Sequence, residues 1–107
     1  MALTRDFKHS IAERFEQEPL FSRALLDEAA CLLLNGEPQM ARLVLRTLVN
    51  ATVGFETLAS VTATPSKSLH RMLSAKGNPS MDNLAAIFDA LRQRLGVGIT
   101  VQTIDAA

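Results

Sequence analysis

The chain has 107 residues, of which 48% are hydrophobic and 21% charged, and 11 basic residues balance 11 acidic ones. This length predicts one domain with one hydrophobic core, and the composition excludes a disordered chain. A net charge of zero excludes a globally basic nucleic-acid binder, but it is compatible with a local basic surface.

Cysteine content and hydropathy indicate the cellular setting. One cysteine, Cys31, excludes an intrachain disulfide and favours a reducing compartment. No apolar run approaches the ~18–20 residues that cross a bilayer, and no basic-then-apolar leader opens the chain. We therefore predict a soluble, cytoplasmic protein with no membrane contact. Cys31 itself lies in an Ala-Leu stretch and is predicted to be a small buried hydrophobic residue.

Glycine and proline divide the chain into short helical segments, because glycine suits helix ends and proline suits first turns. The apolar spacing predicts helices over residues 4–17, 19–35, 38–52, 55–61, 65–75 and 80–95. The expected inward-facing residues of the second helix are Phe21, Leu25, Ala29 and Leu32. Those of the third helix are Met40, Val44, Leu48 and Ala51, with Arg42, Arg46 and Asn50 on the opposite side.

The segment after Gly96 has a different pattern. Apolar residues alternate from Val97 to Ile104, which predicts a short strand over 97–104. A lone strand pairs with another chain, belongs to a hairpin, or stays unpaired. The predicted fold class is all-α, with five to six helices containing a helix-turn-helix and with a short C-terminal β-strand. We expect a single domain over 1–107, comprising an N-terminal helical part (1–53), a helix-turn-helix core (54–95) and the strand tail.

Residues 55–80 carry the functional signal. A short helix, a three-residue break at 62–64 and a second helix beginning at Pro65 have the layout of a helix-turn-helix. Ala59 is small enough for a close helix crossing. Leu69, Met72 and Leu73 form the predicted buried side of the second helix, so its other side is left for the major groove of DNA.

The outer side of that second helix contains residues that can bind DNA. Ser, Lys, Arg and His donate hydrogen bonds to base edges, and a helix N-terminus capped by Thr64 suits a phosphate. We expect Lys67 and Arg71 to make the main contacts; the ring of His70 can instead pack against Leu73 or the turn. The candidate DNA-binding residues are Thr64, Ser66, Lys67, Ser68, His70, Arg71, Lys76 and Asn78.

Catalytic motifs are missing from the sequence. It has no glycine-rich phosphate loop, no nucleophile elbow and no metal-spaced cluster of Cys, His and Asp. We therefore expect no enzymatic activity, no cofactor and no metal.

Three stretches resemble a known family. Residues 49–59 (VNATVGFETLA), 65–73 (PSKSLHRML) and 76–80 (KGNPS) are similar to HigA-like antidote proteins of bacterial type II toxin–antitoxin modules, in the Xre/Cro-type helix-turn-helix group. Residues 3–8 (LTRDFK) are similar too, so the resemblance covers nearly the whole chain. It implies an antitoxin that represses its own operon by binding operator DNA. It also implies neutralisation of a RelE/HigB-type toxin, a small mRNA-cleaving ribonuclease.

Two departures from the family pattern affect the turn. Ala63 stands where glycine is usual, so a left-handed conformation there would cost about 1 kcal/mol. Pro65 stiffens the start of the second helix. An alternative function is a protein-binding helical adaptor whose helix-turn-helix is only scaffolding, and another is a solitary regulator without a toxin.

The sequence also favours a homodimer. One helix-turn-helix with few basic residues binds DNA weakly, whereas a two-fold pair binds two half-sites. The segment from Ala29 to Leu34 has more apolar surface than one stripe can bury. The strand over 97–104 could pair with its copy in a second subunit, or add to the sheet of a toxin. Whether Arg42 and Arg46 contact phosphate or pair with acidic residues 13–28 is left open.

Overall fold

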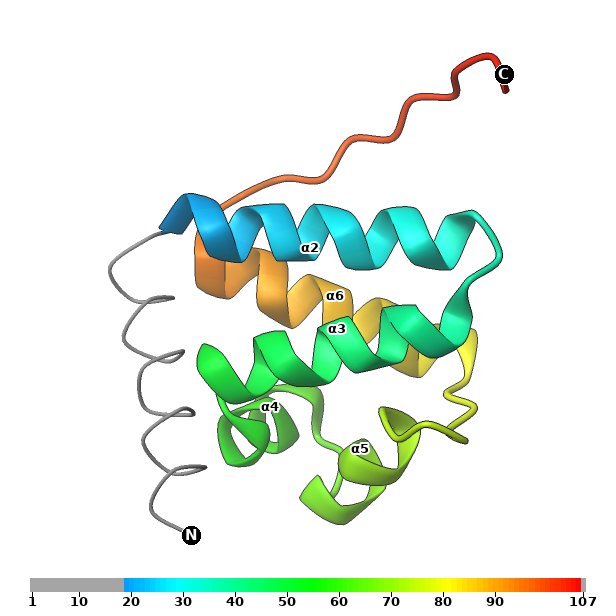
Figure 1. Cartoon of the computed structure of the whole chain (residues 1–107). Coiled ribbons are helices and arrows are strands. Elements are labelled where there is room, and N and C mark those ends of the chain that lie inside the picture. The colour runs from blue at the N-terminus through cyan, green and yellow to red at the C-terminus, as the bar shows by residue number, and fades with distance from the viewer. Residues whose placement is uncertain (1–18, 107) are drawn as a thin grey trace, which may run out of the picture.

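Within residues 19–106, which the computed structural model describes, the chain forms five α-helices and no strand. They are α2 (Pro19–Leu34), α3 (Pro38–Ala51), α4 (Phe55–Thr62), α5 (Ser66–Met72) and α6 (Met81–Leu95). Figure 1 shows α2 and α3 as an antiparallel pair, with α6 behind them and the short helices α4 and α5 on the side away from α2. The helix expected over residues 4–17 lies outside the described residues. None of the five helices is long and apolar enough to cross a bilayer.

A single cluster of buried side chains connects all five helices. Its largest fully buried members are Leu26, Leu45, Leu48, Leu58, Leu69, Leu73, Ile87 and Leu91. Each helix contributes at least one of the buried residues, so α4 and α5 are packed against the longer helices. Burying a leucine contributes about 1.5–3 kcal/mol to folding, and this cluster therefore fixes the orientation of the short pair.

The ends of α6 follow from local sequence signals. The Ser80 hydroxyl accepts a hydrogen bond from the Asn83 amide at 3.1 Å, which caps the first turn. Gly96 adopts the left-handed conformation, with φ 66° and ψ 38°, and ends the helix. The bounds therefore lie within one residue of those predicted, and Ile87 and Leu91 on the inward face are fully buried.

The inward face of α3 differs from the prediction by about one position. Ala41, Leu45, Leu48 and Val49 are buried, whereas Met40 is 47% exposed. The small Ala41 faces the core because α2 packs closely along α3, and the longer Met40 then points outward. Arg42 is consequently half-buried, while Arg46 is exposed as expected.

The second half of α2 is more open than predicted. Ser22, Leu26 and Ala29 form its buried stripe, and Leu32 is half-buried. Cys31 is an exposed free thiol, so its prediction as a buried residue was wrong. The physical reason is that only one stripe of α2 meets α3 and α6, which leaves Cys31 and Leu34 outside; Leu34 is 64% exposed.

The predicted C-terminal strand over 97–104 is absent. Val97 and Ile99 pack against the core cluster, but Val101 and Ile104 are 68% and 85% exposed. Figure 1 shows this tail leaving the helices as an extended segment. The alternating pattern gave an extended backbone, yet no other described segment is extended beside it to form a ladder. Strand assignment requires such a partner.

Candidate nucleic-acid interface

The segment predicted to form a helix-turn-helix comprises α4, the turn at residues 63–65 and α5. Ala63 has φ 53° and ψ 39°, so the chain turns through the left-handed region at an alanine. The Thr64 amide donates to the Ala59 carbonyl at 3.1 Å and closes the turn. Ala63 is therefore the position of this turn that needs a positive φ. The alanine there carries a strain of about 1 kcal/mol.

The predicted capping role of Thr64 is wrong. Its hydroxyl donates to the Thr62 carbonyl at 3.1 Å, and α5 has no side-chain cap. The proline ring disfavours a helical conformation for the residue before it, so Thr64 stays outside the helix. Pro65 then takes the N-cap position with an extended ψ of 138°. The helix begins at Ser66, one residue later than expected.

The two faces of α5 have opposite characters. Leu69 and Leu73 are buried at 1% exposure each, and Met72 is half-buried, as predicted. On the other face Lys67 and Arg71 are exposed four residues apart, which places them side by side on a helix. Neither forms an ion pair with any residue of 19–106. Their charges are therefore available to an anionic partner.

The remaining predicted site residues lie around this pair. Ser66 and Ser68 are half-buried at the start of α5, and Lys76 and Asn78 are exposed in the loop between α5 and α6. The sequence has no acidic residue between Glu56 and Asp82, so no carboxylate in this stretch offsets the basic side chains. Lys67, Arg71 and Lys76 therefore belong to one basic stretch of a neutral chain.

His70 packs against a residue that the sequence analysis did not predict. Its ring stacks on Phe55 of α4, with centroids 3.8 Å apart and planes inclined by 17°. The ring contact is thus with Phe55, which is neither Leu73 nor a residue of the turn. One face of His70 is thus covered by Phe55, itself only 6% exposed, and only the edge and outer face remain for a ligand.

Arg42 of α3 is a site residue that sequence reasoning missed. Its Nε donates to the Ser74 carbonyl at 3.0 Å, and its Nη2 donates to the Ala75 carbonyl at 2.8 Å. These carbonyls directly precede Lys76. The sequence left two roles open for Arg42, phosphate contact and pairing with residues 13–28. Hydrogen bonding to the loop after α5 is neither of these. No local pattern indicates it, because the bonds span 32 and 33 residues.

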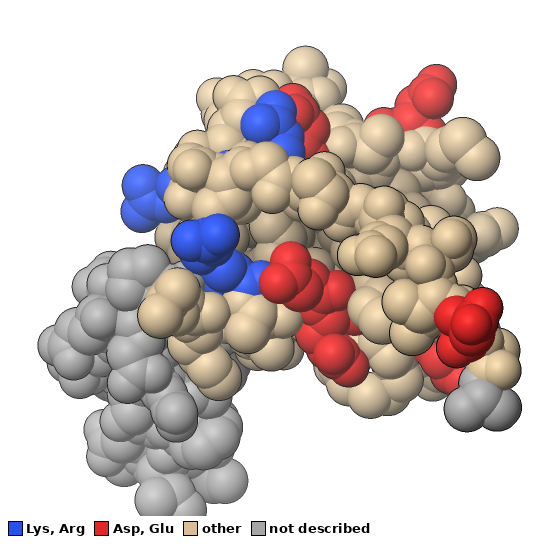
Figure 2. All heavy atoms as spheres, turned by 90° about the horizontal axis from the view of Figure 1, so that it is seen from above, with Lys and Arg blue, Asp and Glu red and all other residues tan. Residues whose placement is uncertain are grey.

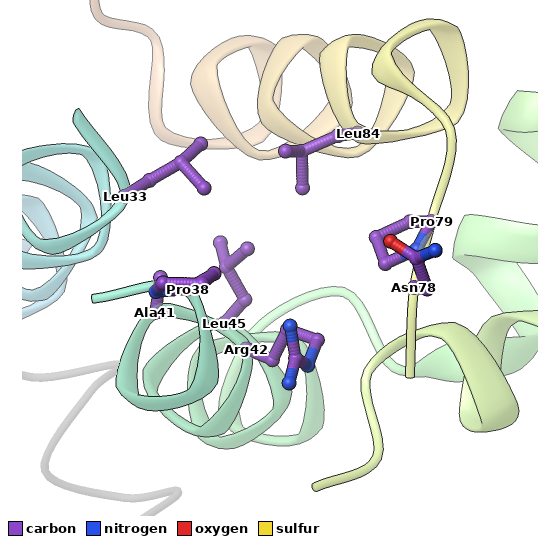
Figure 3. A pocket seen from close by; sticks show the side chains of 8 residues that line it. All are labelled: Leu33, Pro38, Ala41, Arg42, Leu45, Asn78, Pro79 and Leu84. Carbon is purple, nitrogen blue, oxygen red and sulfur yellow. The ribbon is translucent and has the colours of Figure 1, made fainter. Parts of the chain in front are cut away.

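A small hollow lies beside Arg42, between α2, α3, α6 and the loop after α5. Its volume is about 150 Å³, and the side chains that line it are those of Leu33, Pro38, Ala41, Arg42, Leu45, Asn78, Pro79 and Leu84 (Figure 3). Six of these eight are apolar, so the hollow offers packing surface and few polar groups. No group of three His, Cys, Asp or Glu side chains in the described part of the chain is placed to hold a metal.

The opposite side of the molecule differs in charge. Figure 2 views it from the α2 side, where separate basic and acidic side chains lie in a broad uncharged surface. On α6, Arg92 pairs with Asp89 at 2.6 Å, and its hydrogen bond holds the pKa of that carboxyl below its usual range.

Comparison of the chain with protein-family models, with curated proteins and with solved structures gives no match.

Proposed function

We propose that the chain is a sequence-specific DNA-binding regulator that places α5 in the major groove. The observation that carries the proposal is the pair Lys67 and Arg71, which are exposed on α5 and have no ion-pair partner among residues 19–106, while Leu69 and Leu73 anchor its other face. Arginine and lysine side chains bind guanine O6 and N7, and phosphate. A helix packed against a preceding helix is how such side chains are presented to base edges.

The alternative of a protein-binding adaptor is less well supported by this face. Protein interfaces have a core that is poor in charge and enriched in aromatic residues. The outward side chains of α5 are Lys67, His70 and Arg71, and the one aromatic neighbour, Phe55, is buried under His70.

The experiment is selection of duplexes from a random-sequence pool by the intact protein, followed by titration of the enriched duplex. We expect Arg71→Ala to weaken binding by about 1–3 kcal/mol and to relax the sequence preference. Arg94→Ala is the matched control, because Arg94 is an exposed arginine near the end of α6. Failure to enrich any sequence, or normal binding by Arg71→Ala, contradicts the proposal.

We propose further that the regulator acts as a homodimer. The exposed apolar residues on either side of the α2–α3 turn support this: Leu34 is 64%, Met40 47% and Leu43 55% exposed. A dimer would cover them and would double the basic contacts on DNA. Sedimentation at micromolar concentration tests it: Leu43→Glu should give a monomer, and a monomeric parent protein refutes it.

The antitoxin role is proposed from the sequence resemblance, and the exposed tail supports it. Val101 and Ile104 extend away from the helices, and an extended apolar segment can add to the edge of a partner's sheet. Co-expression with a RelE/HigB-type toxin is the test. Removal of residues 100–107 should abolish the complex and leave DNA binding intact, whereas an unchanged complex would exclude this role for the tail.

A further inference from the structure

The loop between α5 and α6 is held by several bonds to its own neighbours. The Ser74 hydroxyl donates to the Arg71 carbonyl at 2.7 Å, and the Gly77 amide donates to the Ser74 carbonyl at 3.1 Å. The Gly77 backbone also lies very close to the end of α5, since a Cβ there would fall 2.1 Å from the Met72 carbonyl oxygen. The loop therefore folds back on the last turn of α5.

Arg42 adds the one side-chain connection between this loop and α3 that the structure records. Its guanidinium spans two successive carbonyls, those of Ser74 and Ala75. The fork geometry of a guanidinium suits this task, because two N–H groups lie in one plane at a fixed spacing. The Arg42 side chain also lines the hollow together with Pro79 and Leu84, so the hollow lies directly beside these bonds (Figure 3).

We propose that Arg42 is a positioning residue for DNA recognition, which rests on the proposed function. By holding the carbonyls of residues 74 and 75, it sets where Lys76 and Asn78 lie relative to Lys67 and Arg71 of α5. The loop side chains then reach the DNA backbone in register with the base contacts of the helix. Arg42 itself touches no DNA, and it acts through the loop.

The first test compares Arg42→Lys with Arg46→Lys. Both variants keep the charge of α3, but only Arg42→Lys removes the paired hydrogen bonds of a guanidinium to the loop. Arg46 is exposed and makes no hydrogen bond with any residue of 19–106. We expect Arg42→Lys to lose about tenfold in affinity for the enriched duplex. Its affinity for a random duplex should change less than twofold, because non-specific binding depends on charge. Equal losses on both duplexes, or an equal loss in Arg46→Lys, overturn the proposal.

The second test separates positioning from direct contact. Arg42→Met removes one positive charge and the fork together. If Arg42 acts only through the loop, the slope of log affinity against log salt is unchanged when Arg42→Met is made in a Lys76→Ala background, where a displaced Lys76 cannot alter the slope. A slope reduced by about 0.9 would mean that Arg42 neutralises a phosphate, and this overturns the proposal.

The third test uses no DNA and distinguishes failure of this inference from failure of the proposed function. Amide hydrogen exchange at Ser74 and Gly77 should accelerate at least tenfold in Arg42→Lys, while exchange at Leu69 stays as in the parent. Unchanged exchange at Ser74 and Gly77 refutes the proposal that Arg42 holds the loop, even where the protein binds DNA. Accelerated exchange in a protein that enriches no duplex would show that Arg42 holds the loop. It would at the same time refute a role for Arg42 in DNA recognition.

Discussion

The ring of His70 lies flat on the ring of Phe55, 3.8 Å away between centroids. This contact joins α4 and α5 through their side chains, and it places a polar ring over a buried apolar one. Stacked aromatic pairs contribute about 0.5–1.5 kcal/mol beyond the area they bury. The position of α5 on α4 therefore depends in part on a residue of the exposed face.

We expect His70→Ala to lower the free energy of unfolding by about 1–2 kcal/mol, because Phe55 loses both its stacking partner and its cover. His70→Phe should retain most of the stability. Urea denaturation measures both. Lys67→Ala is the control, since Lys67 is exposed on the same helix and should change stability by less than ~0.5 kcal/mol.

Ala63→Gly should stabilise the protein by about 0.5–1 kcal/mol, because glycine adopts φ 53° without strain. Ala63→Val should destabilise it, since a β-branched side chain is a poor fit to this conformation. Thermal unfolding is the measurement, and a gain of this size corresponds to a rise of about 2–8 °C in Tm. A lower Tm for the glycine variant would contradict the assigned backbone strain.

Gly77→Ala should destabilise the protein by about 1–3 kcal/mol, because the new methyl group would meet the Met72 carbonyl and the loop must shift. Gly98→Ala is the matched control: nothing lies within 4 Å of a Cβ built there. Chemical denaturation of the two variants should differ clearly. Equal stabilities would show that the loop is not packed on α5.

The pKa of Asp89 is held below its usual range, first by the hydrogen bond from Arg92 and then by the charge of that residue, with Gln93 adding a further donor. A folded-state pKa below the unfolded one gives stability that is present above about pH 4 and is lost as the pH falls through the folded value. An NMR titration of the Asp89 carboxyl should show the low midpoint in the parent protein. Arg92→Gln should raise it, and an unmoved midpoint would exclude Arg92 as the cause.

Much of the fold could be predicted because its signals are local. Pro38, Ser80 and Gly96 mark helix ends through their own backbone preferences, so α3 and α6 were placed within one or two residues. The inward face of α3 was less predictable. Both Met40 and Ala41 fit an apolar stripe, and the close approach of α2 decided between them in favour of the smaller side chain.

In the candidate site, too, local sequence signals predict the roles of some residues and not those of others. Lys67 and Arg71 could be assigned because four-residue spacing on an amphipathic helix fixes their face. The roles of Arg42 and His70 could not, since each depends on a partner from another element: the carbonyls of Ser74 and Ala75, and the ring of Phe55. The strand predicted over 97–104 also failed for want of a partner. Alternating apolar residues specify an extended backbone, and only a neighbouring extended segment makes it a strand.

The Arg42 bonds also bear on the order in which the chain folds. They join residues 32 and 33 positions apart, and α4 and α5 lie between the two ends. Such a loop closes only after the intervening helices have formed, because contacts of large sequence separation carry a high entropy of closure. We therefore expect the guanidinium to engage late on the folding pathway. Its loss should act on the unfolding rate far more than on the folding rate, which makes Arg42 a determinant of how long the native state persists once it has formed.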